Sequence, residues 1–141
     1  MAQLFHVGLT VKNLERSLAF YRDVAEMTAG EHLEVRSKAF DTLTNNPGAA
    51  LKVAHLTAGT FMLQLIEYTA GGGTTLELHH NNAGSPHLCF YVPDVEAKYK
   101  AVQRRGDVKI TSGLVQIAPN MRSFYTEDPD GVPVEFLQLT R

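Results

Sequence analysis

Two histidines occupy the same place in two similar stretches of the sequence. HVGLTVKNLE begins at His6, and HLCFYVPDVE begins 81 positions later, at His87. A single histidine at the start of a strand is more often a core residue than a ligand, because metal and catalytic sites need several groups that converge. A histidine repeated in two copies of one pattern is more informative, since imidazole nitrogens ligate divalent first-row metals.

Strand alternation predicts where these histidines point, because successive side chains of a strand lie on opposite faces of a sheet. His6 and His87 have the polar parity of their strands, so we expect both on the face that lines a pocket. The apolar parity is expected to cover a helix, with Phe5, Val7, Leu9 and Val11 in the first copy and Leu88, Phe90 and Val92 in the second.

The last predicted strand of each copy offers a second pair of candidate ligands. In FMLQLIEY, Leu63 and Leu65 take the helix side, so Gln64 faces the pocket. Glu135 lies 71 positions after Gln64, and its apolar neighbours give it the same orientation. Glu67 has the parity of Leu63, so it is expected to point away and is the weaker alternative ligand.

Four pocket-facing polar groups are therefore expected to form one metal site. Two imidazoles, a carboxylate and an amide oxygen suit one divalent ion, such as Zn, Ni, Co, Mn or Fe(II), and leave its identity open. These candidate ligands are His6, Gln64, His87 and Glu135. Parity also predicts the remaining lining of the pocket, which is Thr10, Met62, Ile66, Cys89, Tyr91, Ser123, Tyr125 and Leu137.

Several other reactive side chains are assigned to structure rather than to chemistry. Cys89 is expected to fill space, because no helix N-terminus or cation is evident near it to favour a thiolate. Tyr91 and Tyr125 suit packing as well as they suit contact with a substrate. The remaining candidates are expected to be exposed to solvent, namely His32, His55, His79, His80 and Arg122.

Two copies of one β-α-β-β-β pattern position these residues. Each opening strand leads to a helix whose cap, Asn13 or Asp94, accepts from amides of the first turn. Three strand-like runs follow each helix, at 28–35, 51–58 and 61–68 and then at 108–111, 121–126 and 134–139. We predict an α+β fold in which modules 1–70 and 86–141, joined by a linker at 71–85, form a curved half-barrel sheet around the metal pocket, with the helices outside.

Composition limits the functional classes. The chain has 141 residues, of which 44% are hydrophobic and 20% charged, enough for one compact domain. The formal net charge of -2 and the absence of a basic block argue against nucleic-acid binding. No apolar run has the length of a membrane span, the start lacks the pattern of a signal peptide, and the single Cys89 excludes an internal disulfide. We expect a cytoplasmic protein that acts on a small molecule.

These features resemble the vicinal oxygen chelate superfamily over nearly the whole chain. The resemblance is carried by the duplication, the opening histidines, FYRD at Phe20 to Asp23, LQLIEY, and the ending YTEDPDGVPVEFLQL. That superfamily includes glyoxalase I, methylmalonyl-CoA epimerase, extradiol dioxygenases, fosfomycin-resistance enzymes and the metal-free bleomycin-resistance proteins. Its members share a site and differ in reaction, so the resemblance specifies the fold better than the chemistry.

The resemblance implies the same four metal ligands, in a pattern closest to the glyoxalase and epimerase branches. It implies a lyase or isomerase acting on a small carbonyl or vicinal-oxygen substrate by enolate or enediolate chemistry, with Glu135 as the base, in a homodimer. A two-base epimerase would need a further group from the loop 36–46, such as Asp41. An Fe(II) extradiol-type dioxygenase and a ligand-sequestering resistance protein are the alternatives.

Overall fold

The computed structural model describes all residues 1–141 and divides them into two compact units, Met1–Thr75 and Leu76–Arg141. Helices and strands occur in both units, so the predicted α+β class is confirmed. No helix is both long and apolar enough to cross a membrane.

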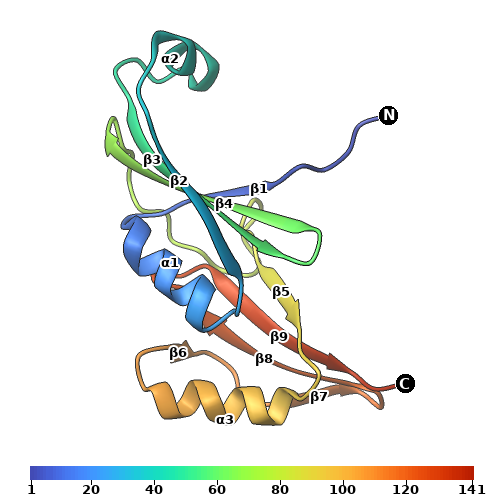
Figure 1. Cartoon of the computed structure of the whole chain (residues 1–141). Coiled ribbons are helices and arrows are strands. Elements are labelled where there is room, and N and C mark those ends of the chain that lie inside the picture. The colour runs from blue at the N-terminus through green and yellow to red at the C-terminus, as the bar shows by residue number, and fades with distance from the viewer. The chain divides into compact units, whose positions relative to one another are not determined.

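The first unit is a four-stranded sheet with one long and one short helix (Figure 1). The strand order is β1-β4-β3-β2, with β1 parallel to β4 and the other pairs antiparallel. The elements are β1 (Val7–Thr10), α1 (Leu14–Asp23), β2 (Thr28–Val35), α2 (Lys38–Thr44), β3 (Ala50–Ala58) and β4 (Phe61–Ala70).

Helix α1 packs against strands β2, β3 and β4 through its apolar side. Leu18 and Tyr21 of the helix and Leu63 and Leu65 of β4 are buried, as the alternation predicts. Burying a leucine side chain contributes about 1.5–3 kcal/mol, so this layer holds the helix on the sheet. The prediction for Phe5 is wrong, since its side chain is 72% exposed. It precedes β1, where no neighbouring strand fixes the orientation of the backbone.

The second unit repeats this plan around a five-stranded sheet. The order is β5-β9-β8-β6, with β5 parallel to β9, and β7 also pairs with β8. The elements are β5 (Leu88–Tyr91), α3 (Val95–Arg105), β6 (Lys109–Ile110), β7 (Val115–Ala118), β8 (Met121–Glu127) and β9 (Pro133–Leu139). Helix α3 lies along one face of β8 and β9 (Figure 1).

Aromatic rings dominate the core of the second unit. Phe136 and Phe124 are buried and stack with centroids 5.3 Å apart, and Tyr99 of α3 meets Phe124 edge-on at 5.1 Å. Val95 and Val134 are also fully buried. The face of each sheet away from its own helix, here called the open face, carries the more polar parity in both units.

The two helices begin in the same way, which explains how each is fixed to its sheet. Asn13 and Asp94 cap the first turns as predicted, each accepting a backbone N–H at 2.9 Å. A second acceptor comes from the last strand, because Leu14 N donates to Glu67 Oε2 at 2.7 Å and Val95 N donates to Gln138 Oε1 at 3.1 Å. Glu67 therefore points to the helix side, as its parity predicts.

The two units differ in two inserted elements. The segment 36–46 was expected to be a loop, but it contains α2, which stands at the end of the β2–β3 pair (Figure 1). Ser37 Oγ caps this helix by accepting from Phe40 N at 3.1 Å. Strand β7 is the second addition. It was missed because its four residues Val115 to Ala118 form a short, largely exposed run, although Val115 and Ile117 alternate with Gln116.

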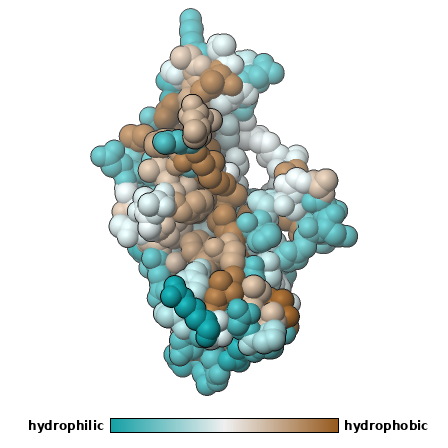
Figure 2. Space-filling view, turned by 90° about the vertical axis from the view of Figure 1, so that its right-hand side faces the viewer, coloured by the Kyte–Doolittle hydropathy of each residue, from teal (hydrophilic) through white to brown (hydrophobic).

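Hydrophobic side chains are exposed as well as buried. Figure 2 shows brown surface among teal side chains on one face of the chain. The large hydrophobic residues most open to solvent include Leu4, Phe5, Leu43, Leu76 and Tyr91. These residues belong to different segments, and single exposed apolar side chains are common on protein surfaces.

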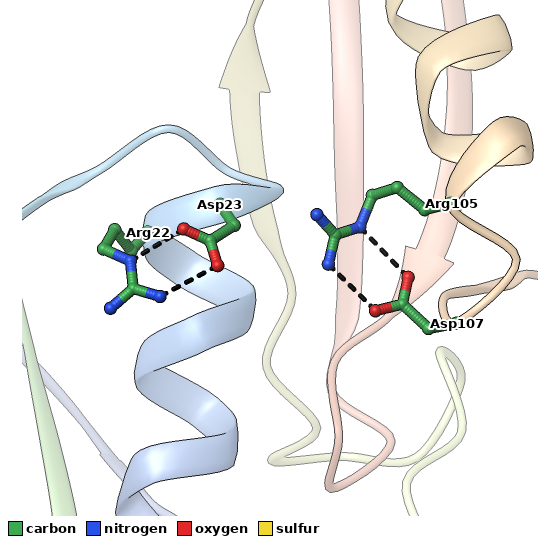
Figure 3. Close-up of polar contacts among 4 residues, drawn as sticks. All are labelled: Arg22, Asp23, Arg105 and Asp107. Atoms are coloured by element: carbon green, nitrogen blue, oxygen red, sulfur yellow. Dashed lines mark hydrogen bonds and ion pairs between the residues drawn. The ribbon is translucent and has the colours of Figure 1, made fainter.

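Each long helix ends beside a two-bond ion pair (Figure 3). Arg22 donates to both carboxylate oxygens of Asp23 at 2.7 and 2.9 Å, and Arg105 donates to those of Asp107 at 3.0 and 2.9 Å. The hydrogen bond to Asp23 is the main cause that raises the pKa of the Arg22 guanidinium. Both pairs are exposed to solvent, which screens such interactions.

Candidate functional site

The first unit brings three polar side chains together on its open face. Gln64 lies in β4 between Gly8 of β1 and His55 of β3, which are its cross-strand partners. The imidazoles of His6 and His55 lie with centroids 6.3 Å apart. His6, Gln64 and His55 are all partly buried. The strand register therefore assembles a small polar cluster from segments far apart in the sequence.

The donors of this cluster are not all used within the unit. Nε2 of Gln64 lies 3.0 Å from Nε2 of His55, whereas Nδ1 of His6 is buried without a hydrogen-bond partner. A Cβ added at Gly8 would stand 3.8 Å from Gln64 Oε1, so the glycine leaves space beside the amide oxygen. A buried nitrogen without a partner and an accessible amide oxygen are features expected of a ligand site.

The second unit carries a carboxylate on the equivalent position of its open face. Glu135 lies in β9, and Ser123 Oγ and Tyr125 Oη of β8 donate to its two oxygens at 2.5 and 3.0 Å. Cys89 of β5 is its partner on the other side. Hydrogen bonds to both oxygens of one carboxyl group hold it in one orientation.

Cys89 and Tyr125 stay protonated at neutral pH. Burial is the largest cause that raises the pKa of each to about 12, and the adjacent Glu135 carboxylate adds to both shifts. Tyr125 is therefore a hydrogen-bond donor, and Cys89 is a thiol rather than a thiolate. This agrees with the expectation that Cys89 is not a nucleophile.

His87 lies beside Tyr125 in a group of three rings. The ring centroids are 6.0 Å apart for His87 and Tyr125, 4.8 Å for His80 and Tyr125, and 6.4 Å for His80 and His87. A pocket of about 420 Å³ opens next to this group. Its lining comes from the segment before β5 and from the β6–β9 region, namely Leu78, His79, His80, Asn81, Thr111, Ser112, Tyr125, Glu127 and Pro133.

The other predicted lining residues divide between the two units. Met62 and Ile66 lie on β4 with the parity of Gln64, and Thr10 ends β1 with an exposed side chain. Ser123 is buried, Leu137 is partly buried and Tyr91 is 64% exposed. Arg122, expected on the surface, is partly exposed, and its guanidinium lies 3.6 Å from Glu96 of α3.

Sequence reasoning missed two histidines that belong to these clusters. His55 was expected to be an exposed strand residue, but it is partly buried and bonded to Gln64. His80 was expected to be solvated, and although it is exposed its ring packs on Tyr125. His55 has the parity of Val53 in β3, a buried residue, so alternation alone gave no signal for it. Only the register opposite Gln64 identifies its role.

The donor types of the two clusters fit a divalent metal. No group of three or more histidine, cysteine, aspartate or glutamate side chains is gathered closely enough to hold a metal ion. The candidate donors are two imidazoles, one amide oxygen and one carboxylate, and the first unit contributes the unpartnered His6 Nδ1. Nitrogen and oxygen donors of this kind suit Zn, Ni, Co, Mn or Fe(II).

Comparisons with known proteins identify the family of the chain. The family model of the Glyoxalase/Bleomycin resistance protein/Dioxygenase superfamily matches residues 3–136. An uncharacterized protein of Bacillus subtilis, YwbC, is 24% identical, with 94% of each chain covered. Lactoylglutathione lyase of Neisseria meningitidis is 30% identical, with 96% of this chain and 90% of that protein covered.

Solved structures share the fold at lower identity. A glyoxalase family protein from Bacillus cereus has a TM-score of 0.88 and 14% identity, covering 99% of this chain and 96% of that chain. The fosfomycin resistance protein FosX from Listeria monocytogenes has a TM-score of 0.70 and 18% identity, covering 99% and 95%. The duplicated pattern, the paired histidines and the matched family model together show that the chain belongs to the Glyoxalase/Bleomycin resistance protein/Dioxygenase superfamily.

Proposed function

We propose that this protein is a metal-dependent lyase or isomerase of the glyoxalase type, acting on a small carbonyl or vicinal-oxygen substrate. The observation that carries the proposal is the pair of open-face clusters, one with an unpartnered imidazole nitrogen and one with an oriented carboxylate. The similarity to lactoylglutathione lyases over most of the chain supports this reaction class.

The proposed ligands are His6, Gln64, His87 and Glu135, which would hold one divalent ion. A FosX structure that shares the fold contains Mn(II) and a dihydroxypropylphosphonic acid, which supports metal binding by this fold. When bound, such an ion is a Lewis acid that stabilises negative charge developing on a substrate oxygen. The rest of the predicted lining would contact the substrate, namely Thr10, Met62, Ile66, Cys89, Tyr91, Ser123, Tyr125 and Leu137.

The chain itself supplies the group that moves a proton. A carboxylate oxygen of Glu135 takes a proton from a carbon next to a carbonyl, as a positioned general base. Ser123 and Tyr125 fix the orientation of the Glu135 carboxyl group through hydrogen bonds of 2.5 and 3.0 Å. Tyr125 can do this at neutral pH because a tyrosine hydroxyl is protonated there, and burial raises the pKa of Tyr125 further, to about 12.

Metal analysis tests the ligand set without a known substrate. Wild type purified without chelator should contain about one divalent ion per site, and His6→Ala or His87→Ala should lose it because each deletes a ligand. His32→Phe changes an exposed histidine of β2 and serves as the matched control. Metal-free wild type whose thermal stability is unchanged by Zn, Ni, Co, Mn and Fe(II) would refute the proposal.

A substrate screen distinguishes the possible reactions. The screen should include adducts of 2-oxoaldehydes with thiols, acyl-CoA thioesters, and catechols with an oxygen electrode. Metal-dependent turnover of the first or second class supports a lyase or isomerase. Oxygen uptake with a catechol would instead indicate a dioxygenase, and tight binding without turnover a sequestering protein.

We also propose that the chain acts as a homodimer. Each sheet ends in strands with unpaired edges, such as β2 in the first unit and β5 in the second, and such edges favour pairing with another chain. Sedimentation at micromolar concentration should give the mass of two chains. A monomer under those conditions would contradict this part of the proposal.

A further inference from the structure

The hydrogen bond between Gln64 and His55 corresponds to one tautomer of the His55 ring. The amide nitrogen of Gln64 only donates, so at 3.0 Å the Nε2 atom of His55 must accept. An imidazole that accepts through Nε2 is neutral and carries its proton on Nδ1. The pair therefore links one tautomer of His55 to one orientation of the Gln64 amide.

That orientation determines which end of the amide faces β1. Strand β4 lies between β1 and β3, so Gly8 and His55 are the neighbours of Gln64 on its two sides. The nitrogen is turned to His55, and the oxygen is turned to the space above Gly8, where an added Cβ would stand 3.8 Å away. The His6 ring lies with its centroid 6.3 Å from that of His55, so His6 is on the same face of the sheet as this pair, and the oxygen faces the side that carries His6.

The orientation matters because only the oxygen of an amide can ligate a divalent metal. If the amide were rotated by 180°, its NH₂ group would face the ligand side and repel a cation. Nothing else in the first unit selects between the two orientations, because Gln64 makes no other side-chain hydrogen bond that would do so. His55 supplies that selection only as the tautomer with its proton on Nδ1, because a proton on Nε2 would instead donate to the amide oxygen and favour the rotated amide.

The second unit has a hydrogen bond at the equivalent position, with the donor and acceptor roles reversed. The cross-strand neighbour of Glu135 on β8 is Tyr125, as His55 on β3 is the neighbour of Gln64. Tyr125 donates to the carboxylate at 3.0 Å, whereas His55 accepts from the amide at the same distance. In both units, then, the residue directly across the strand pair matches the hydrogen-bonding character of the proposed ligand.

We propose that His55 is a positioning residue for the metal site. By accepting a hydrogen bond from Gln64 Nε2, it holds the Gln64 oxygen toward His6, and so presents an oxygen donor to the metal. This inference rests on the proposed ligand set. It assigns His55 no direct contact with metal or substrate.

Metal affinity of the full chain tests the inference without any substrate. Isothermal titration of the metal-stripped protein with Mn(II) should show that His55→Phe, which keeps a ring but removes the acceptor, binds about 10- to 100-fold more weakly than wild type. His55→Gln offers a carbonyl oxygen as acceptor and should restore most of the affinity. His32→Phe, an exposed histidine on the adjacent strand, should bind as wild type does.

The tautomer of His55 is a second measurement. If His55 had only a structural role, its tautomer would not depend on Gln64. Long-range proton–nitrogen NMR of the metal-free protein should show the proton on Nδ1 in wild type and a mixture of tautomers in Gln64→Leu. This measurement also serves if His55→Phe fails to fold. A wild-type proton on Nε2 would overturn the inference.

The remaining outcomes separate this inference from the proposed function. If Gln64→Leu weakens Mn(II) binding and a folded His55→Phe does not, His55 does not position the ligand and only this inference fails. If Gln64→Leu binds Mn(II) as tightly as wild type, Gln64 is not a ligand, and the ligand set fails with it. Loss of affinity in His55→Gln as complete as in His6→Ala would make His55 a ligand and would also overturn a positioning role.

Discussion

The two units use the same pair of side-chain types in exchanged places. In β4 the amide of Gln64 lies on the open face, and the carboxylate of Glu67 accepts the hydrogen bond at the start of α1. In β9 the carboxylate of Glu135 lies on the open face, and the amide of Gln138 accepts the bond at the start of α3. Each strand thus carries one amide and one carboxylate three residues apart.

This exchange of amide and carboxylate shows that the two units share the positions of these side chains but not their charges. The open-face position of each last strand receives a hydrogen bond partner from the next strand, which is an acceptor for Gln64 and a donor for Glu135. The helix-side position needs only an oxygen acceptor, which an amide or a carboxylate can supply. The two units can therefore carry different functional groups at equivalent positions without a change in the fold of either.

The largest expected effect is on turnover, and it comes from removing the negative charge of Glu135, which the equivalent Gln64 lacks. Glu135→Gln makes this position chemically like Gln64 while keeping its shape and one oxygen donor. Turnover of a substrate found in the screen should fall by about a hundred- to ten-thousand-fold, since the proton acceptor is lost. Metal content should persist, and His87→Ala, which should lose metal and rate together, is the comparison. Wild-type turnover by metal-loaded Glu135→Gln would leave Glu135 at most a structural ligand.

The next effect compares the two cores. Leu65 and Phe136 lie 71 positions apart at matching places, and both are fully buried. Replacement by alanine should lower the free energy of unfolding by about 2–5 kcal/mol for Leu65 and about 3–5 kcal/mol for Phe136, because each leaves a cavity. Urea denaturation followed by circular dichroism measures both, with the exposed Leu43→Ala as control. A loss well below about 2 kcal/mol for Leu65 or about 3 kcal/mol for Phe136 would contradict the packing described for that unit.

The helix acceptors should differ by a smaller amount. Glu67→Ala removes a charged acceptor from the N-terminus of α1, which should cost about 1.5–3 kcal/mol, whereas Gln138→Ala removes a neutral one, which should cost about 0.5–1.5 kcal/mol. The larger cost for Glu67 also reflects its favourable interaction with the helix dipole. Glu67→Gln, which copies the second unit, should recover much of the loss in the same denaturation experiment. Equal costs for the two alanine variants would show that the charge contributes nothing.

The smallest effect on stability is expected at the two Arg–Asp pairs at the C-terminal ends of α1 and α3 (Figure 3). Arg22→Ala and Arg105→Ala should leave the unfolding midpoints almost unchanged, since exposed ion pairs are screened by water and salt. Midpoints measured at low and high sodium chloride check this. A salt-dependent loss at one pair alone would reveal a stabilising role specific to that unit.

Much of the fold was predictable because its signals are local or periodic. Asn13 and Asp94 cap helices through amides three residues away, so the interaction lies within one turn of chain. Alternation predicted the buried side of β4 and β9 correctly, since burial repeats every second residue in a strand. The same periodicity predicted that Glu67 points to the helix side.

The sequence could not predict features that depend on weak local signals. Helix α2 is seven residues long and has no buried residue, so it lacks the buried apolar face that identifies longer helices, although Ser37 and Asn45 cap its two ends. Strand β7 is exposed and ends in an irregular register with β8. Phe5 has the correct parity but lies outside β1, where parity has no meaning without a paired strand.

By itself, the sequence determined the α+β duplication, the helix caps, the helix side of each sheet and the candidate ligands His6, Gln64, His87 and Glu135 as matching positions. Only the tertiary structure decided which side chains meet those ligands. His55 reaches Gln64, and Ser123 and Tyr125 reach Glu135, through the register between strands. These residues lie in the antiparallel β3–β4 and β8–β9 pairs, 9 to 12 residues apart in the chain. Their register depends on the geometry of the turn that joins the two strands, which apolar alternation within one strand does not specify.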